Sequence, residues 1–514
     1  MRPPLEPNAR RAVRPWPEPS RSLAALAALL AVLGAGLLAR SGVPPASAGT
    51  SAEPNIVFIL TDDQAQNSFR RAVMPRTFRQ VVDRGTRFNQ ALATPPLCCP
   101  YRAGFITGQH VHNHGVRTNK SGYSLLLEPD EVLPEWLREA GYETALVGKY
   151  LNGATAALGA EAAPGWDEWY AADLKSGFEN PLIATEGEFV TVPGYLTDVL
   201  TDRAVTYIED RASEPEPFFL WLSQIAPHNN RSTTRHCPST AAQPTAEDYR
   251  AFDGPSFSKV RSPSFNEADT SDKPQRVRRL PRLSDEQIAH IHRRWRCTVA
   301  ALSSVDRGVG RVMSALRDTG QLDDTVLVFG SDNGLLFGEH RIPGGKSEAY
   351  DEVWRVPFAM RVPPGALGSP AVGKVSELVT QQDLTATVLE LAGAEPCISA
   401  LNCRRLDGRS FASLLRGDTG AWPRRKILYE LHPECGRKAL GVRTSRYVYV
   451  QRAPECGGGA RELYDRRRDP FELENLAKKR RGLARQLQRV AKRQRRCTGV
   501  EGRDDPLGEL PFCR

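Results

Sequence analysis

The sequence predicts an α/β protein with a large, mostly parallel mixed sheet flanked by helices and a smaller antiparallel sheet near the C-terminus. Three observations support this fold class. Several short runs are wholly apolar, which is typical of strands covered on both faces. Helical patterns separate these runs, as in domains that alternate strands and helices. From about Lys426 the apolar residues alternate with polar ones, which indicates antiparallel strands.

Individual elements follow from these patterns. The candidate strands of the large sheet are the apolar runs 55–60, 144–147, 217–222 and 325–330. Helical spacing occurs over 131–140 and within 284–319, where one face carries Val305, Val309, Val312 and Leu316. Two neighbouring strands of the C-terminal sheet are expected at 446–450 and 462–465. Residues 229–283 are rich in Ser, Thr, Pro and charge, so we expect a long surface excursion at the rim of a cleft.

The N-terminal segment 1–48 has the order of a secretory signal peptide. Several arginines precede an apolar run over 23–39, and a small-residue cleavage pattern ends at Ala48. An uncleaved membrane anchor is the alternative, although the run is slightly short and two glycines interrupt it. Arg10 and Arg11 hint weakly at a twin-arginine export route. We therefore expect a secreted or cell-surface protein, and the high Arg, Ala and Gly content indicates a GC-rich bacterial source.

Cysteine usage agrees with an oxidising destination, since the chain contains ten cysteines. Most of them form close pairs in the sequence. The expected disulfides are Cys397 with Cys403, Cys435 with Cys456, and Cys497 with Cys513. Cys237 and Cys297 are the candidates for a fourth pair, and the sequence alone does not determine the connectivity. Cys98 and Cys99 are adjacent and lie in a different context.

Positive charge is concentrated near the C-terminus. The formal net charge is +9, and residues 478–496 include ten basic and no acidic residues. Leu483, Leu487 and Val490 have helical spacing, so this segment is expected to form an amphipathic helix with a basic outer face. One interpretation is an ordinary solvated surface helix, and the other is attraction to a polyanion such as a sulfated polysaccharide. Nucleic acid is not expected as the partner of an exported protein.

Polar clusters follow three of the candidate strands. Asp62 and Asp63 follow the first, Asp332 and Asn333 follow another, and His228 comes shortly after a third. In parallel sheets, ligands bind beyond the carboxyl ends of the strands, so these clusters can meet at one crevice. The two acidic clusters supply only oxygen ligands, which suit calcium or magnesium better than zinc. Either cluster alone is also typical of a turn or a helix cap, but two such clusters favour a metal site.

The segment 97–108 places a cysteine at the start of a short helix. Pro100 suits the first turn of that helix, and Gly108 suits its end. The helix dipole then favours negative charge at Cys98, and Arg102 lies one turn away on the same face. These features suit a nucleophile that attacks a tetrahedral oxyanion ester, either sulfate or phosphate. From the segment alone, a structural thiol beside a disulfide partner is the alternative.

These residues closely resemble the signature of the sulfatases, a family of the alkaline phosphatase superfamily. The signature is Cys98-x-Pro100-x-Arg102 followed by Thr107-Gly108. Further motifs occur in the family's order and cover nearly the whole chain from Asn55 to about Ala477. They are Asp62-Asp63, Gly148-Lys149-Tyr150, Pro227-His228, Ser331-Asp332-Asn333-Gly334, Gly345-Lys346, Arg355-Val356-Pro357 and Glu462-Leu463-Tyr464-Asp465. The Cys-Cys-Pro form and Gly-Lys-Tyr-Leu-Asn look most similar to N-acetylglucosamine-6-sulfatases, with arylsulfatases also similar.

The resemblance implies a specific catalytic apparatus. A formylglycine-generating enzyme would oxidise Cys98 to formylglycine, whose hydrated form is the nucleophile. One calcium ion would be bound by Asp62, Asp63, Asp332, Asn333 and the residue derived from Cys98. Arg102 would hold the formylglycine, Lys149 and Lys346 would bind sulfate oxygens, His228 would assist proton transfer, and Asp332 would be the base for the attacking hydroxyl.

The expected activity is the hydrolysis of aryl or carbohydrate sulfate esters, with N-acetylglucosamine 6-sulfate as one candidate substrate. The partner at the site would be a sulfated small molecule or saccharide. The corresponding organisation is a signal peptide at 1–48, a catalytic domain at 53–425, and a C-terminal subdomain with the basic helix at 426–514.

Two positions depart from the family pattern. Tyr101 stands where many members have serine, and Leu151 stands where many have a histidine. The role of that histidine must then be absent or supplied by another residue. Asn152, His112 and His114 are candidates, although the two histidines are equally well explained as loop or surface residues.

Other functions are compatible with parts of this pattern. A phosphatase of the same superfamily would use Ser or Thr and two zinc ions with histidine ligands, which the cysteine and the Asp-Asn cluster do not match. A formylglycine-dependent hydrolase of phosphonate or phosphate esters is harder to separate from a sulfatase. An inactive secreted polyanion-binding protein is a third alternative, and the intact nucleophile and metal ligands argue against it.

Overall fold

The structure is a computed structural model. It describes residues 53–120, 122–172, 177–229, 233–252, 261–368, 370–399, 401–423, 426–432, 438–453 and 459–513. The expected signal peptide and the expected pair Cys435–Cys456 lie outside the described residues. Residues 51–514 form one compact unit. Within the described part of the chain, no helix combines the length and apolar character that crossing a membrane requires.

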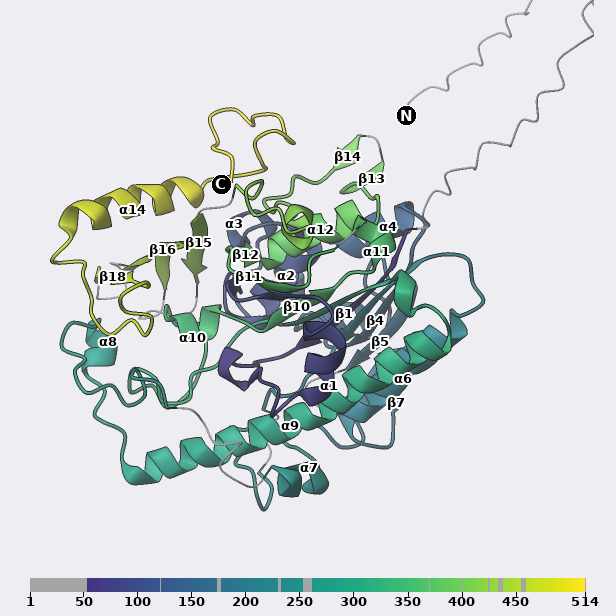
Figure 1. Cartoon of the computed structure of the whole chain (residues 1–514), viewed down its shortest axis with the longest axis horizontal. Coiled ribbons are helices and arrows are strands. Elements are labelled where there is room, and N and C mark those ends of the chain that lie inside the picture. The colour runs from purple at the N-terminus through teal and green to yellow at the C-terminus, as the bar shows by residue number, and fades with distance from the viewer. Residues whose placement is uncertain are drawn as a thin grey trace, which may run out of the picture. The chain divides into compact units, whose positions relative to one another are not determined.

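A large mixed sheet forms the centre of this unit (Figure 1). Among the described residues its strand order is β11-β2-β10-β9-β1-β8-β4-β5-β6-β7. The five consecutive strands from β9 to β5 are parallel to one another, and antiparallel pairs occur only toward the two edges. The bounds are β1 (Asn55–Thr61), β2 (Thr86–Phe88), β4 (Glu143–Gly148), β5 (Glu168–Ala172), β6 (Leu182–Thr185), β7 (Glu188–Thr191), β8 (Phe218–Ser223), β9 (Thr325–Ser331), β10 (Phe358–Arg361) and β11 (Gly373–Val375). The predicted fold class and its four central strands are confirmed.

The central strands are unbroken hydrophobic runs in the sequence because apolar clusters pack on both faces of the large sheet. Along β1, Phe58 packs into the cluster on one face with Phe105 and Trp221, while Val57 packs into the cluster on the other. Successive side chains of a strand point to opposite faces, so a strand between two helical layers must be apolar at every position.

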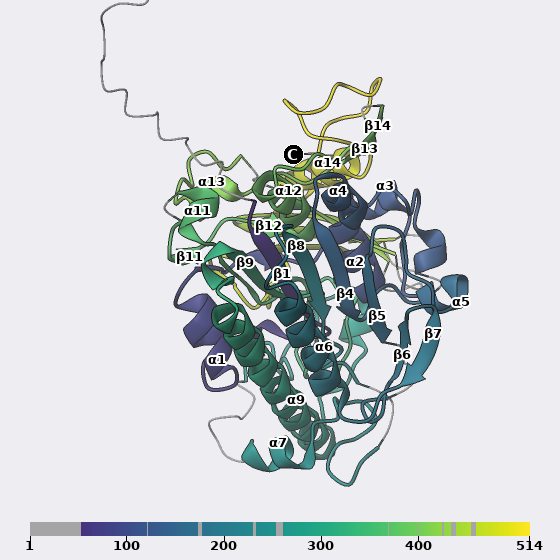
Figure 2. The same ribbon diagram turned by 90° about the vertical axis from the view of Figure 1, so that its right-hand side faces the viewer.

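Helices cover both faces of the sheet (Figure 2). The long helix α9 (Asp285–Asp318) packs with α6 (Leu196–Asp210) on one face. The opposite face is covered by α2 (Cys98–Thr107), α4 (Leu133–Glu139) and α12 (Gln381–Leu391). Ser284 begins α9 with a capping box to Gln287, and the four apolar residues predicted for its buried face are all buried. Both predicted helices are therefore confirmed, with bounds shifted by one or two residues.

Short elements complete the structure. The short helices are α1 (Pro75–Thr77), η1 (Gln66–Ser68), η2 (Phe78–Val82), α3 (Val111–His114), η3 (Tyr123–Leu125), α5 (Ala154–Leu158), α7 (Ala246–Ala251), α8 (Gln275–Arg278), η6 (Leu322–Asp324), α10 (Asp351–Trp354), α11 (Pro364–Leu367) and α13 (Ala412–Leu415). Two small pairs of strands are β3 (Ala91–Leu92) with β12 (Val379–Thr380) and β13 (Cys397–Ser399) with β14 (Asn402–Cys403).

A four-stranded antiparallel sheet follows from Lys426. Its strands are β15 (Lys426–Leu431), β16 (Ala439–Thr444), β17 (Tyr447–Arg452) and β18 (Arg461–Asp465), paired in sequence order. One face packs against the preceding part of the chain, where Trp354 and Tyr429 stack with ring centroids 3.5 Å apart. The other face packs against α14 (Arg481–Gln494), as the apolar spacing of that segment predicts. The predicted boundary between two domains at residue 425 stays a prediction.

The segment 229–283 is only partly the surface excursion that its composition suggests. Glu267, Lys273 and Val277 are buried. The Lys273 ammonium lies 3.0 Å from a Glu267 carboxylate oxygen, and His340 Nδ1 lies 2.7 Å from the other. Burial of paired charges leaves no apolar signal in the sequence, which is why these residues resembled a solvated loop.

Three of the expected disulfides are present among the described residues: Cys237–Cys297, Cys397–Cys403 and Cys497–Cys513. Cys98 and Cys99 are both buried free thiols. The alternative in which one of the two adjacent cysteines is a disulfide partner is therefore wrong.

Candidate active site

Three adjacent parallel strands bring the predicted polar clusters together. In the sheet register, Thr61 of β1 pairs with Ser331 of β9, and Leu60 pairs with Ser223 of β8. Residues that follow these strands therefore leave the sheet at the same edge. The convergence of Asp62, Asp63, Asp332, Asn333 and His228, expected because these clusters follow strands of a parallel sheet, is present in the structure.

Lys149 reaches the same edge from the next strand. It follows β4, whose last residue, Gly148, lies opposite Ser223 of β8. Gly148 has φ of 113°, and a Cβ atom there would lie 2.1 Å from the Ser223 carbonyl oxygen. Only glycine permits this close approach, which sets the position of the lysine beyond it.

Cys98 enters the site from the opposite layer, as the first residue of α2. The helix ends at Gly108 in the left-handed conformation, as its sequence predicts. Cys98 Sγ lies 3.3 Å from Asp62 Oδ1 and 2.7 Å from Lys346 Nζ. Single ligand atoms of Asp62, Asp63, Cys98 and His228 all lie within 4.8 Å of one another.

The acidic residues and Asn333 form a closely bonded group. Asn333 Nδ2 donates a hydrogen bond of 2.6 Å to Asp63 Oδ1, and the Asp63 backbone N–H donates one of 3.2 Å to Asp332 Oδ1. Asn333 is fully buried, and its Oδ1 atom accepts no hydrogen bond from the described residues. An unbonded buried amide oxygen beside three carboxylates is the donor set expected for a hard divalent cation.

Three cationic side chains neutralise the carboxylates. Arg102 is fully buried: its Nε donates 2.9 Å to Asp332 Oδ2, and its Nη1 donates 2.7 Å to the Lys149 carbonyl. The Lys149 ammonium donates to Asp62, and the Lys346 ammonium donates to Asp63. Lys346 and His228 are the more accessible members, with side chains 16 and 22 % exposed, so the site opens to solvent beside them.

Burial controls the chemistry of the Cys98 thiol. Burial, with help from the Asp62 charge, raises the pKa of Cys98 to about 12, although Lys149 and Lys346 act in the opposite direction. A thiol with this pKa stays protonated at neutral pH, and the protonated thiol is a poor nucleophile. The geometry therefore places Cys98 at the centre of the site while making its unmodified side chain unreactive.

The surrounding charges are stabilised by each other. Burial acts to lower the pKa of Lys346, but Asp63 and Asp62 outweigh it and hold the pKa well above its usual value. Burial raises the pKa of Asp332, and the neighbouring Asp62 charge acts in the same direction. For Asp62, burial is outweighed by Lys149, His228 and Lys346, which hold its pKa below the usual range.

The structure gives other roles to the candidates for the missing histidine. His112 uses both ring nitrogens, at 2.8 Å from Glu430 and 2.9 Å from the Cys497 carbonyl, to join α3 to the C-terminal region. His114 is fully buried, and its Nδ1 accepts a hydrogen bond from the Val116 backbone N–H. The Asn152 side chain donates from Nδ2 to the Asn119 carbonyl, and its backbone N–H donates to Cys99 Sγ.

Sequence reasoning missed one polar member of the site. Ser223, the last residue of β8, accepts a hydrogen bond of 2.6 Å from Arg102 Nη1 and is fully buried. Thr61 and Ser331 end β1 and β9 with hydroxyl side chains as well, so each of these three neighbouring strands ends in a hydroxyl residue. That common ending is a sequence signal that could have identified Ser223.

Comparison with known proteins agrees with this geometry. The family profile described as Sulfatase matches residues 54–394, which include all the residues of the site. The chain belongs to the sulfatase family. A second profile, described as N-sulphoglucosamine sulphohydrolase, C-terminal, matches residues 338–496. The prediction of a sulfuric ester hydrolase is thereby confirmed at the level of the family.

Relatives of this sulfatase-family chain include the N-acetylglucosamine-6-sulfatase of Homo sapiens, 32% identical over 449 residues that cover 84% of this chain and 75% of that protein. The putative extracellular sulfatase Sulf-1 homolog of Caenorhabditis elegans is 32% identical over 373 residues. That match covers 70% of this chain, which spans about half (49%) of the worm protein's length.

Solved structures share the fold. One described as a complex with its substrate D-glucosamine-2-N,6-O-disulfate has a TM-score of 0.65 at 23% identity and covers 86% of this chain and 98% of that one. The phosphonate monoester hydrolase of Agrobacterium radiobacter has a TM-score of 0.64 at 20% identity and covers 85% of this chain and 94% of that one. The fold is therefore common to enzymes named for different ester substrates.

Replacement of Lys346 tests its proposed contact with substrate. Lys346→Met is expected to lower kcat/KM for an aryl sulfate by about 100-fold, because it removes a fixed cation beside the developing charge. The measurement is steady-state turnover, with thermal unfolding as a check on folding. The matched control is Lys374→Met, on an exposed edge strand, which is expected to leave turnover unchanged. Equal activity of the two variants would remove Lys346 from the substrate site.

Proposed function

We propose that this protein hydrolyses sulfate esters, with a nucleophile formed from Cys98 by oxidation to formylglycine and with one calcium ion. The observation that carries the proposal is the position of Cys98 in a chain of the sulfatase family. Its side chain is fully buried at a helix N-terminus between Asp62 and Lys346, where the thiol itself stays protonated. An oxidised side chain explains why a cysteine that is unreactive as a thiol occupies the centre of the site.

The donor set fits a bound cation. Asp62, Asp63, Asp332 and Asn333 would hold it, together with the residue derived from Cys98, and the buried Asn333 Oδ1 accepts no hydrogen bond from the described residues. When bound, calcium supplies fixed positive charge that polarises the ester and stabilises charge in the transition state. Magnesium would require a stricter octahedral arrangement of oxygens.

Several charged side chains of the site would take part in sulfate binding. The formal charges of Asp62, Asp63 and Asp332 are balanced by those of Arg102, Lys149 and Lys346, so a divalent cation leaves the site net positive and suited to an anionic ester. Lys149 and Lys346 would contact sulfate oxygens as point charges. Arg102 would hold the modified side chain in place because its guanidinium is fixed by Asp332 and Ser223.

Proton transfer is assigned to two residues. Asp332 would accept the proton of the attacking hydroxyl, since it is a carboxylate of the cluster and its pKa is raised by burial and by the Asp62 charge. His228 would donate a proton to the leaving alcohol, because it lies at the accessible side of the site with Nε2 3.7 Å from Asp63 Oδ2.

A sulfated saccharide is the proposed substrate class. Support comes from relatives named N-acetylglucosamine-6-sulfatase and from the solved structure that holds a glucosamine disulfate. We also propose export to the cell exterior, because relatives are named extracellular sulfatases and disulfides occur in the described residues. A formylglycine-generating enzyme is the implied partner that modifies Cys98.

Hydrolysis of phosphonate or phosphate esters is the second candidate function, favoured by the shared fold of the Agrobacterium enzyme. The test is turnover of matched 4-nitrophenyl sulfate, phosphate and phenylphosphonate, together with N-acetylglucosamine 6-sulfate, by the purified exported chain. We expect kcat/KM to be highest for a sulfate ester. A higher value for the phosphonate would replace the proposed function with the alternative.

A further inference from the structure

The basic helix α14 and the segment that follows it form a groove outside the catalytic cluster. Four basic residues line one side: Lys492, Arg493, Arg495 and Arg496. Residues 508–512 line the other side, and the groove has a volume of about 1090 Å³. None of the residues that line it belongs to the catalytic cluster. We propose that this groove and the basic face of α14 bind an extended sulfated polysaccharide, an inference that rests on the proposed function.

The basic residues of α14 share one face. At about 100° per residue, Arg481, Arg485, Arg489, Lys492 and Arg493 fall within an arc of about 120°. All five are exposed, while Ala484, Leu487 and Ala491 on the opposite side pack onto the C-terminal sheet. The stripe runs for about 18 Å along the helix, which is the scale of a polymer rather than of one sulfate group.

The five cations on this face lack acidic partners among the described residues. None of them lies within ion-pair distance of a carboxylate there, whereas Lys479 before the helix pairs with Glu474 and Arg495 after it lies 3.8 Å from Glu430. Glu501 and Glu509 line the far part of the groove, so its positive character is strongest beside α14. An uncompensated row of exposed cations attracts polyanions and holds them in a salt-dependent way.

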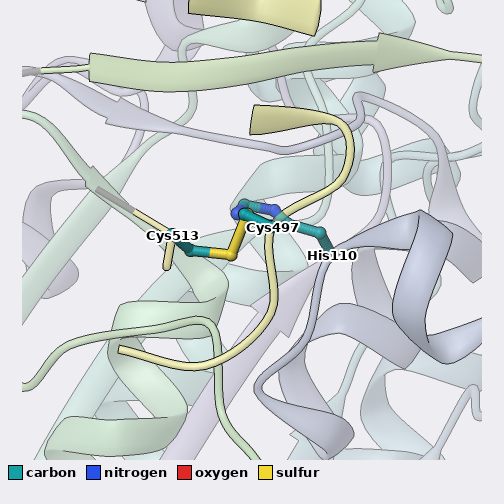
Figure 3. A group of neighbouring side chains, drawn as sticks. All are labelled: His110, Cys497 and Cys513. Atoms are coloured by element: carbon teal, nitrogen blue, oxygen red, sulfur yellow. A yellow bond between two sulfur atoms is a disulfide. The ribbon is translucent and has the colours of Figure 1, made fainter. Parts of the chain in front are cut away.

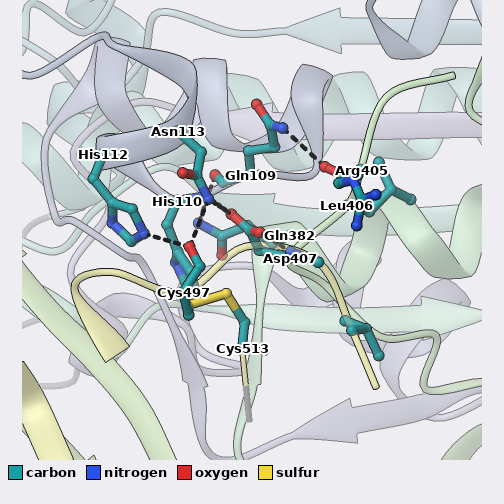
Figure 4. The surroundings of a disulfide bond; sticks show 12 residues. Gln109, His110, His112, Asn113, Gln382, Arg405, Leu406, Asp407, Cys497 and Cys513 are labelled. Carbon is teal, nitrogen blue, oxygen red and sulfur yellow. Dashed lines mark hydrogen bonds between the residues drawn. A yellow bond between two sulfur atoms is a disulfide. The ribbon is translucent and has the colours of Figure 1, made fainter. Parts of the chain in front are cut away.

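The second wall of the groove is held in place by covalent and polar contacts. The disulfide between Cys497 and Cys513 closes the segment into a loop beside His110 (Figure 3). The Cys497 carbonyl accepts a hydrogen bond from Asn113 and lies 2.9 Å from His112 Nε2, and Asp407 accepts one from Asn113 (Figure 4). Asp407 also accepts a hydrogen bond of 3.0 Å from the Gly499 backbone N–H.

Because this wall is fixed, the groove exists before a ligand binds, and little ordering entropy opposes binding. The wall presents Leu510, Pro511 and Phe512 opposite the cations. A ligand with negative groups on one edge and apolar C–H faces on its rings matches both walls. A sulfated polysaccharide has both features, and the proposed catalytic reaction acts on the same class of molecule.

The groove would act by retaining the polymer while successive esters reach the catalytic site. Retention affects only substrates long enough to contact α14. Variants of the groove should therefore change KM for a polymer and leave the turnover of a small aryl sulfate unaltered.

The test compares two variants that each lose three positive charges. The groove variant is Arg485→Gln, Arg489→Gln and Arg493→Gln, which removes two cations of the basic face of α14 and one that also lines the groove. The control is Arg79→Gln, Arg84→Gln and Arg293→Gln, three exposed arginines outside α14 and the groove. Binding to heparin, to desulfated heparin, to a DNA duplex and to phosphatidylglycerol vesicles is measured at two salt concentrations, in the full chain carrying Cys98→Ala so that no substrate is consumed.

We expect the groove variant to bind heparin about tenfold more weakly than the control at low salt, and desulfated heparin to bind weakly to both. In the chain with Cys98 intact, both variants should hydrolyse 4-nitrophenyl sulfate at a rate within about twofold of the wild type. A third variant, Phe512→Ala, is expected to weaken heparin binding about threefold even at high salt, because it removes an apolar contact.

Equal heparin binding by the groove variant and the control would overturn the inference. So would DNA or vesicle binding that is as strong as heparin binding and is lost in the same variant, since the partner would then be a different polyanion. If the proposed function were wrong and this inference right, the protein would not hydrolyse aryl sulfates but would still bind heparin. The two failures can therefore be told apart.

Discussion

Cys98→Ala is expected to lower kcat/KM for 4-nitrophenyl sulfate by roughly 10⁴-fold or more. The substitution leaves a methyl group that cannot be converted to the aldehyde, at the position where Cys98 lies between Asp62 and Lys346. The folded structure should survive, because alanine in the first turn of α2 keeps the backbone conformation and Pro100 remains in that turn.

The matched control is Cys99→Ala. Cys99 is also a buried thiol at the start of α2, but its Sγ accepts a hydrogen bond from the Asn152 backbone N–H and makes no contact with the acidic cluster. We expect this variant to retain activity within a few fold. Mass spectrometry of the peptide that contains both residues should show an aldehyde at Cys98 and a thiol at Cys99. Wild-type turnover by Cys98→Ala, or a thiol at Cys98 in fully active protein, would refute the proposed nucleophile.

The central fold and much of the candidate site could be predicted from the sequence because both depend on short-range patterns. An apolar run such as 55–60 can be satisfied only between two covering layers, and its parallel neighbours then leave the sheet at one edge. Asp62 and Asp332 are 270 positions apart in the sequence. They lie close together because they directly follow β1 and β9, which are parallel neighbours in the sheet. Pro100, in the first turn, and Gly108, after the last residue, likewise predicted where α2 begins and ends.

Other features depend on contacts that no local pattern records. Ser223 belongs to the site because it accepts a hydrogen bond from Arg102, which lies on a helix that covers the sheet. The burial of Glu267 and Lys273 depends on mutual charge pairing and on His340. His112 lies near the catalytic helix in sequence, but its ring contacts Glu430 and the Cys497 carbonyl, more than 300 positions away. The closeness of His112 to the Cys98 motif in the sequence therefore did not predict the role of the His112 side chain.

The ion pairs at the site lead us to expect that cation binding affects stability as well as catalysis. Arg102, Lys149 and Lys346 each contact a carboxylate of the proposed cation site. Loss of the cation would leave the carboxylates paired with these three side chains alone, and an ion that binds only the folded chain stabilises the folded state. Cation binding should therefore be measurable by unfolding as well as by turnover.

Removal of the cation is expected to lower turnover by roughly 10³-fold, because charge in the transition state loses several kcal/mol of stabilisation. EGTA should inactivate the enzyme, and calcium should restore activity in preference to zinc, because the ligands are carboxylate and amide oxygens. In the same samples, calcium at about 100 times its Kd should raise the free energy of unfolding by about 2.7 kcal/mol. Recovery with zinc alone would contradict the oxygen-based site.

Asp63→Asn separates loss of the ion from loss of the nucleophile. The change keeps the size of the side chain but removes a charge that faces both Asn333 and Lys346. We expect the calcium concentration for half-maximal activity to rise about tenfold or more, since affinity follows the charge of the ligand set. Asp323→Asn, at a side chain 92% exposed, should leave this concentration unchanged. If Asp63→Asn were inactive at every calcium concentration yet showed normal calcium-dependent unfolding, Asp63 would act on the substrate rather than on the ion.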